Sequence, residues 1–371
     1  MIMKQLKVTG ILWAISAILP LILLAACAKT DAAPDAVPEG LKLLAPEVSV
    51  APSVENPASR AIITGTSLPA NSSIVGLYVC NHETVPSLFS PMAQGYNNMQ
   101  AAKVTVNESY PRGWRYVLNG NATNLSQLFL RSDADVDIYA YYPYSSANNT
   151  KNPTELSFTS GSTNDYMWGT VTPSRINVPA DYASATEIPM DITLHHAMTC
   201  IQIRIQVNYT GSIVVSSLTL SDRQGRIIAN GTFSTIDGTI TPGVTDDNLT
   251  CTFGTIINQT TSHNPTDPPN PGKYFDFYLM FPAIPEGIEP GDLTLTFNFK
   301  DGTTESGSME NIESSYTIPV DPLKYNNPTE KCGLRTGYKY VYSITISNYV
   351  KFTPIGVVPW EDTPEIIDYE I

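Results

Sequence analysis

Apolar and polar residues alternate one by one along much of this chain, and this alternation restricts the possible folds more than any other feature. Successive side chains of a β-strand point to opposite faces of its sheet, so a period of two predicts a strand with one buried face. In the clearest run, four apolar residues alternate with three polar ones: Ile201, Ile203, Ile205 and Val207 with Gln202, Arg204 and Gln206. Together with Ile192 and Leu194, this run predicts a half-buried pair of strands.

Further strands are predicted after residue 60, bounded by Asn, Gly or Pro turn residues. They are Ala61–Thr64, Ser73–Val79, Lys103–Val106, Trp114–Leu118, Val136–Tyr142, Ile213–Leu220, Arg226–Ala229, Tyr274–Phe281, Leu293–Phe299 and Tyr338–Ile346. In Val136–Tyr142 we expect one face in the core and a half-exposed face that carries Tyr139 and Tyr141. Apart from Leu125–Leu130, no window sustains the period of an amphipathic helix.

The length and the strand pattern together predict an all-β protein with two antiparallel β-sandwiches in tandem. The chain has 371 residues, and a single core stops growing beyond ~250–300 residues. The boundary is expected near Val207–Ser212, which gives an N-terminal domain of residues 61–208 and a C-terminal domain of residues 209–371.

The N-terminus has the order of an export signal. Lys4 and Lys7 precede the short apolar run Ile11–Leu24, which is followed by the small residues Ala25 and Ala26 and then by Cys27. The apolar run is shorter than the ~20 residues that a membrane span needs. This arrangement resembles a bacterial lipobox, in which the bond between Ala26 and Cys27 is cut and Cys27 receives the lipid. The alternative is an ordinary signal peptide with a coincidental cysteine. An exported, lipid-anchored protein is therefore expected, with residues 1–26 as the signal peptide.

The charge and the composition exclude several classes of function. The formal net charge is −14, with 35 acidic against 21 basic residues, and such a surface repels the phosphate backbone of nucleic acids. The remaining cysteines Cys80, Cys200, Cys251 and Cys332 are widely spaced, without a CxxC pair, so a zinc site has little support. Export permits disulfides among them, but the apolar runs around Cys80 and Cys200 favour buried thiols.

No pattern in the chain predicts catalysis, a cofactor or a metal. His195 and His196 are adjacent and cannot face the same side of a strand, so we expect one of them to be satisfied in the core or a turn. The acidic residues Asp246 and Asp247 lack the spacing of a calcium loop and are expected to be solvated. A pair of carboxylates for glycoside hydrolysis could come from distant strands, but nothing in the sequence selects such a pair.

Two segments near the ends of the mature chain point to a role without catalysis. Arg60 closes a proline-spaced segment of the kind that proteases cut, although it could equally be an ordinary surface arginine. At the C-terminus, Ile367, Tyr369 and Ile371 alternate with Asp368 and Glu370 up to the last residue. A tail with this pattern is expected to pair with a sheet, either in its own domain or at the sheet edge of a neighbouring molecule.

Several motifs together resemble the fimbrillin family, the lipoprotein precursors of type V pili in Bacteroidales. The motifs are Arg60–Pro69 leading into Ile74–Tyr78, Asp137–Tyr144, Asp165–Gly169, Leu194–Ile201 and Gly337–Ile346 with Trp360. The resemblance implies two transthyretin-like β-sandwich domains and an outer-membrane lipoprotein precursor that is assembled into a fimbria on the cell surface, where it serves adhesion and biofilm formation.

In the polymerising members of that family, an arginine-specific protease cuts before the mature N-terminus and releases the first strand, and the C-terminal strand of another subunit fills the groove. By resemblance, the bond between Arg60 and Ala61 would be cut, and residues 27–60 would be the tether with its removable strand, Leu41–Val54. The donor strand would lie in Glu365–Ile371, with the apolar residues Ile366, Ile367, Tyr369 and Ile371.

The resemblance leaves the type of subunit open. The partners of a shaft subunit would be further copies of this chain together with anchor and tip subunits. A fimbrial anchor would keep its lipid and remain uncut, whereas a tip adhesin or a surface lipoprotein that does not polymerise would use its tyrosine-rich loops to bind a host glycan or protein.

Overall fold

β-strands are the main secondary structure in the part of the protein that the structure describes. The computed structural model describes residues 41–50, 67–69, 73–83, 87–88, 97–118, 121–125, 127–130, 134–178, 187–207, 211–259, 275–284, 286–301, 312–319, 333–346 and 350–359. These residues form five sheets and one short 3-10 helix, η1 (Ser146–Asn148). No helix in these ranges is long and apolar enough to cross a bilayer. The all-β prediction is confirmed.

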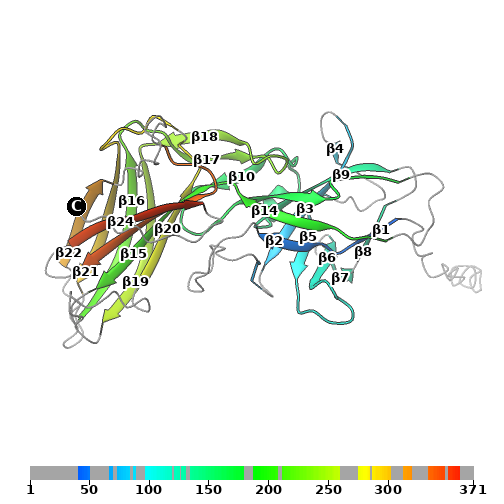
Figure 1. Ribbon diagram of the computed structural model, residues 1–371, viewed down its shortest axis with the longest axis horizontal. Helices are drawn as coiled ribbons and strands as arrows, with labels where there is room; N and C mark the ends of the chain where they lie inside the picture. Colours follow the sequence, from blue (N-terminus) through cyan, green and yellow to red (C-terminus); the bar gives the residue numbers. More distant parts are fainter. Residues whose placement is uncertain are drawn as a thin grey trace, which may run out of the picture. The chain divides into compact units, whose positions relative to one another are not determined.

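The first half of the chain forms a large sheet and a small one (Figure 1). The order of the large sheet is β2 (Glu47–Val50), β14 (Asp191–His196), β11 (Met167–Thr172), β9 (Asp135–Tyr142), β3 (Ile74–Asn81), β5 (Met99–Lys103), β6 (Trp114–Leu118) and β7 (Asn121–Leu125). Two short strands, β12 (Arg175–Asn177) and β4 (Ser87–Leu88), pair with β9 and β3. The small sheet has the order β13 (Glu187–Ile188), β1 (Leu41–Leu44) and β8 (Gln127–Leu130).

The second half forms two four-stranded sheets and contributes to a third sheet. One has the order β20 (Phe275–Phe281), β15 (Thr199–Val207), β23 (Tyr338–Ile346) and β24 (Val350–Pro359). The other has the order β19 (Asn248–Gln259), β16 (Gly211–Asp222), β21 (Leu293–Asp301) and β22 (Ile312–Pro319). The third sheet joins β10 (Leu156–Thr159) to β17 (Ile227–Phe233) and β18 (Ile240–Asp246).

Each half has its own apolar core, and alternate residues of the strands fill it. In the first core, Leu43, Val75, Leu77 and Leu194 are fully buried between the large and the small sheet. In the second core, the alternating residues Ile201, Ile203 and Ile205 of β15 lie among side chains of the opposite sheet, such as Leu218, Leu220 and Phe297. Two facing sheets with interdigitating apolar faces form a sandwich, as the alternation predicts.

The two strands around residues 191–207 have separate partners, contrary to the prediction of a strand pair. β14 pairs with β11 and β2, whereas β15 pairs with β20 and β23. The change of sheet therefore occurs between His196 and Thr199. The apolar alternation on both sides of this point is equally regular, so the pattern alone does not mark the change of partner.

A third apolar cluster covers the face of β9 that was expected to be half exposed. Tyr141 is 1% exposed and lies with Tyr78 of β3, Phe158 of β10 and Met280 of β20 in this cluster. Tyr139 on the same face is only partly buried. The expectation was therefore correct for Tyr139 and wrong for Tyr141, because strands from the second half of the chain supply the cover.

The cysteines are buried thiols in the described part of the chain. Cys80, Cys200 and Cys251 are free and buried, which confirms the prediction for these three residues. Burial raises the pKa of Cys80 to about 12, so this thiol is un-ionised and unreactive at neutral pH. Cys332 and the predicted strand Ala61–Thr64 lie outside the described residues.

Tyr141 packs directly on the backbone of Gly76, its neighbour on β3. A Cβ atom at position 76 would overlap the tyrosine ring. The ring cannot move aside easily, because its hydroxyl donates to Asn98 Oδ1 at 2.6 Å and accepts from the backbone N–H of Ser145 at 3.1 Å. Gly76 is thus required for the close approach of this ring to β3.

We expect Gly76→Ala to lower the free energy of unfolding by about 1–3 kcal/mol, because the added methyl group forces the Tyr141 ring out of its packed position. Urea denaturation followed by tryptophan fluorescence measures this change. Gly254→Ala on β19 is the matched control, since a Cβ there meets no atom within 4 Å, and its effect is expected to stay within about 0.5 kcal/mol. Equal losses for both variants would contradict the packing argument.

Candidate functional site

The first described strand, β1, is inserted between two strands that come much later in the chain. It pairs antiparallel with β8, with Leu41 opposite Leu130, and parallel with β13, with Lys42 opposite Glu187. Leu41 and Leu43 point into the first core with exposures of 5% and 0%. Because β1 lies in the middle of the small sheet, its removal would leave both β8 and β13 with unpaired edges.

The second strand, β2, forms the end of the large sheet. It runs parallel to β14, with Val48 opposite Ile192 and Val50 opposite Leu194. Val48 and Val50 are buried in the first core, whereas Glu47 and Ser49 on the other face are exposed. The pattern of exposed and buried residues therefore matches the alternation of the sequence along this strand.

The connection Ala45-Pro46 lets one short segment serve two sheets. Leu41, Leu43 and Ala45 are buried before the proline, and Val48 and Val50 are buried after it. The buried positions therefore change from odd to even numbers at Pro46. Proline has no N–H group for the hydrogen bonds between strands, and it holds the residue before it in an extended conformation. The five buried side chains all belong to the first core.

Polar side chains of β6 and of the preceding turn hold this segment at its exposed rim. The Tyr116 hydroxyl donates to the carbonyl of Leu44 at 2.9 Å. Arg112 Nη2 donates to the carbonyl of Met190 at 2.8 Å and to the carboxylate of Asp191, and lies 3.8 Å from Glu47 Oε2. Asp191 and Glu47 are exposed, so these ion pairs contribute at most about 1 kcal/mol each.

Sequence reasoning did not find Arg112 and Tyr116 as contacts of this segment. Tyr116 is 72 positions away in the sequence from Leu44, whose carbonyl it binds, and Arg112 is 78 positions away from Met190, whose carbonyl it binds. No local pattern connects residues so distant in the chain, because only strand pairing brings them together.

All the site residues predicted from the sequence lie outside the described residues: Ala26, Cys27, Arg60, Ala61, Ile366, Ile367, Tyr369 and Ile371. The described chain does reach the start of the C-terminal tail. β24 pairs antiparallel with β23 and is the last strand in the order of its sheet. Among the described strands, β24 is therefore at the edge of its sheet, and the tail follows it in the sequence.

The two adjacent histidines have separate environments, as their positions on a strand predict. His196 is buried, and its Nδ1 lies 2.8 Å from Asp165 Oδ1, which is also buried. His195 lies against the ring of Trp168 at a centroid distance of 5.0 Å. His196 is the histidine that lies in the core, as predicted for one of the two, and its Nδ1 has a buried acidic partner. Among the described residues, no group of three His, Cys, Asp or Glu side chains could hold a metal.

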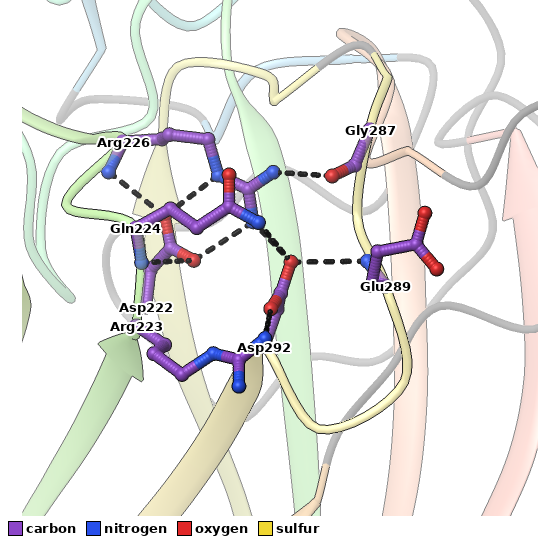
Figure 2. A network of polar contacts seen from close by, with 7 residues as sticks. All are labelled: Asp222, Arg223, Gln224, Arg226, Gly287, Glu289 and Asp292. Carbon is purple, nitrogen blue, oxygen red and sulfur yellow. Dashed lines mark hydrogen bonds and ion pairs between the residues drawn. The ribbon is translucent and has the colours of Figure 1, made fainter.

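Two buried carboxylates at one end of the second sandwich, Asp222 and Asp292, share an arginine (Figure 2). Asp222, at the end of β16, accepts hydrogen bonds from Arg226 Nε at 2.9 Å and Nη2 at 2.8 Å. It also accepts from the backbone N–H groups of Arg226 and Gln224. Arg226 Nη1 in turn donates to the carbonyl of Gly287 at 2.6 Å.

Asp292 completes the same network from the loop that precedes β21. Its carboxylate accepts from Arg223 Nη2 at 2.9 Å, Gln224 Nε2 at 2.6 Å and the backbone N–H of Glu289 at 3.0 Å. Arg226 Nη2 lies 3.2 Å away and bridges both carboxylates. Figure 2 shows the two acids on facing segments with the arginine and glutamine side chains between them.

These contacts keep both acids ionised, which suits a structural role. Burial by itself raises the pKa of Asp222, but the hydrogen bonds from Arg226 and the backbone outweigh it and hold the pKa below its ordinary value. The N–H of Glu289 and the guanidinium of Arg223 likewise lower the pKa of Asp292. A general acid in glycoside hydrolysis needs a raised pKa, so this pair is arranged to tie the turn after β16 to the loop before β21.

Comparison with known proteins gives a family for the chain. The sequence profile described as Fimbrillin-like matches residues 91–360. No curated protein sequence matches the chain.

Solved structures of low sequence identity are also similar. A protein of Bacteroides ovatus with a proposed role in cell adhesion is 15% identical, with 86% of this chain and 97% of that chain covered and a TM-score of 0.46. A similar protein of Bacteroides uniformis is 14% identical, with 86% of this chain and 97% of that chain covered and a TM-score of 0.45. The tip fimbrial protein Mfa3 of Porphyromonas gingivalis is 9% identical, with coverages of 86% and 99% and a TM-score of 0.36.

The carboxylate network predicts a specific loss of stability in acid. A lowered pKa stabilises the folded protein above the unfolded pKa of about 3.9, and this contribution is lost as the pH falls through the folded value. The urea midpoint of the wild type is therefore expected to be level from about pH 7 to pH 5 and to fall below about pH 4.

Asp292→Asn should begin from a lower midpoint at neutral pH, because Arg223 and Arg226 lose a charged partner, and should then fall less steeply in acid. Glu155→Gln, at an exposed residue, is the control and should follow the wild type. If Asp292→Asn shows the same fall in acid as the wild type, the network does not carry this pH dependence.

Proposed function

Because the chain belongs to the fimbrillin-like family, we propose that it is a structural subunit of a fimbria and polymerises by exchange of one strand for a strand of the next subunit. The family consists of fimbrial and adhesion proteins and is not an enzyme family. The observation that carries the proposal is the position of β1 and β2. An N-terminal segment of the described chain fills a groove in the first core and pairs with three later strands.

The burial of this segment explains why it would stay in place until it is replaced. Each fully buried large apolar side chain contributes about 1.5–3 kcal/mol, and four such side chains, Leu41, Leu43, Val48 and Val50, are at most 5% exposed. An empty groove would expose these contact surfaces together with the unpaired backbone groups of β8, β13 and β14. Loss of the segment is therefore unfavourable unless another strand takes its place.

The C-terminal tail of a second subunit has the pattern that such a groove accepts. Ile367, Tyr369 and Ile371 alternate with acidic residues, as Val48 and Val50 alternate with Glu47 and Ser49. A strand added to a sheet edge gains affinity from main-chain hydrogen bonds, and its alternate side chains fill pockets. Partners of this chain would then be further copies of itself, with anchor and tip subunits at the two ends of the fibre.

Maturation in this proposal links the membrane anchor to the groove. Lipidated Cys27 would hold the precursor at the outer membrane, and cleavage between Arg60 and Ala61 would turn residues 27–60 into a separate peptide. That peptide carries both the lipid and the strands β1 and β2. Its release would free the subunit and open the groove in one event, so that polymerisation begins only after export.

One test of the proposal concerns release of the N-terminal segment after cleavage. In protein cut after Arg60, Leu43→Ala should weaken retention of the peptide by about 2–5 kcal/mol, because the leucine is wholly buried in the first core. Native mass spectrometry over time measures the fraction of peptide still bound. Lys42→Ala is the control, since Lys42 lies on the opposite face of β1 and is partly exposed. Equal release from both variants would show that the buried face does not hold the peptide.

Another test concerns the role of the protein as the polymerising subunit of the fibre shaft. Deletion of residues 364–371 should leave folded monomers that do not polymerise, because the acceptor groove remains and the donor strand is absent. Arg60→Ala should also stop polymerisation, but the protein should keep its lipid and its N-terminal peptide. Size-exclusion chromatography, electron microscopy and mass spectrometry of sheared fibres report these states.

Other results of the same experiment would change the assignment. Loss of folding on deletion of the tail would make it an internal strand. Protein recovered only with lipidated Cys27 at the base of fibres would indicate an anchor subunit.

A further inference from the structure

A small polar cavity lies beside η1, apart from the groove of the N-terminal segment. Its volume is about 220 Å³. Its walls come from the end of β9, the segment after it with η1, β10, the loop after β10, and β17. The lining residues are Tyr141, Pro143, Tyr144, Ser145, Asn148, Ser157, Asn164, Tyr166 and Phe233. Pockets for drug-sized ligands usually measure about 300–1,000 Å³. This cavity is smaller and therefore suits one small ring or one unit of a longer ligand.

Hydrogen bonds fix the wall on the side of η1. Asn98 Nδ2 donates to the carbonyl of Ser145 at 2.9 Å, and the Tyr78 hydroxyl donates to the carbonyl of Asn148 at 2.9 Å. The Tyr141 hydroxyl is also engaged, with Asn98 Oδ1 and the N–H of Ser145. The groups that shape the cavity are thus held in place before a ligand arrives, which reduces the ordering cost of binding.

The opposite wall presents polar groups with remaining hydrogen-bonding capacity. The Tyr166 hydroxyl accepts from the backbone N–H of Thr159 at 3.3 Å and from Asn164 Nδ2 at 3.2 Å, so its own proton can be donated to a ligand. The side-chain carbonyl of Asn164 is an acceptor, and the hydroxyl of Ser157 can act as donor or acceptor. Ser157 and Asn164 are exposed, so a ligand can reach them from solvent.

The chemistry of the walls selects a neutral ligand that is rich in hydroxyl groups. None of the nine lining residues carries a charge, and a chain with a net charge of −14 disfavours anions. Tyr144 and Tyr166 are partly exposed aromatic residues of the lining, and the negative quadrupole of an aromatic face attracts polarised C–H groups. A sugar ring combines a C–H face with hydroxyl groups at its edge, and it matches both kinds of wall.

We propose that this cavity is a binding site for one residue of a neutral saccharide. Tyr166, Asn164 and Ser157 hydrogen-bond the hydroxyl groups, and the sugar face lies against an aromatic ring. The site gives the subunit an adhesive function that does not depend on strand exchange, because none of its residues belongs to the groove of β1 and β2. In a fibre, weak single sites would be repeated along the shaft and would act together.

Saturation-transfer NMR on the full chain with a panel of neutral, anionic and cationic sugars tests this site. We expect binding of at least one neutral hexose in the millimolar range. Asn164→Ala should weaken it about three- to tenfold, as expected for the loss of one hydrogen bond, and Ser157→Trp, which fills the cavity, should abolish it. Asn152→Ala and Thr154→Trp, at exposed residues outside the cavity, are the matched controls and should bind as the wild type does.

The outcomes that overturn the proposal are equally defined. Absence of transfer to every neutral sugar, unchanged binding in Ser157→Trp, or stronger binding of a charged sugar that Ser157→Trp abolishes would each refute it. Thermal melting shows whether a variant remains folded. Assembly of Ser157→Trp into fibres is expected to be normal, so failure of the sugar site can be told apart from failure of the polymerisation proposal.

Discussion

The pairing of β1 and β2 with strands that come much later in the first half of the chain is the interaction on which the rest of this half depends. A strand is stable only when its backbone groups are paired and one of its faces is buried. β1 pairs with the backbone groups of β8 and β13, and β2 pairs with those of β14. The same two strands bury Leu43, Val48 and Val50 in the first core. In the proposed strand exchange, the segment that stabilises this half is also the one that has to be replaced when subunits join.

Polar contacts refine this framework at its edges. The Asp222 and Asp292 network ties a turn to a loop at one end of the second sandwich, and Arg112 and Tyr116 secure the rim of the N-terminal segment. The buried acids are fully hydrogen-bonded, which is the condition under which buried charge is tolerated. The cavity near η1 differs from both sites, because its exposed wall keeps hydrogen-bonding capacity toward solvent.

Local patterns predicted many of the strands, but not all of them, and predicted their partners poorly. The predicted strand Lys103–Val106 continues no further than Lys103, and β18, β19 and β22 were not predicted. The alternation of Ile201, Ile203 and Ile205 identified β15 and the face that lies in the second core. The opposite face, expected to be exposed, is covered as well, because Gln202 and Gln206 are only 2% and 5% exposed. The apolar surroundings of Cys80 and Cys200 correctly indicated free, buried thiols. The same alternation suggested that β14 and β15 pair with each other, which is wrong. The candidate groove was only partly visible, because Arg112 and Tyr116 are remote in the chain from the backbone groups they bind.

The amino-acid order alone specifies an all-β chain with an acidic surface, buried thiols, a lipobox-like N-terminus and an alternating tail. These are properties of short segments, and side-chain periodicity or composition is sufficient to establish them. Tertiary structure was needed to show that Leu41–Val50 occupies a groove, that Tyr141 is covered and that Asp222 meets Asp292. Such facts depend on which strands pair across long stretches of sequence. The alternation of apolar and polar residues along a strand is the same whichever strand it pairs with, so it does not identify the partner.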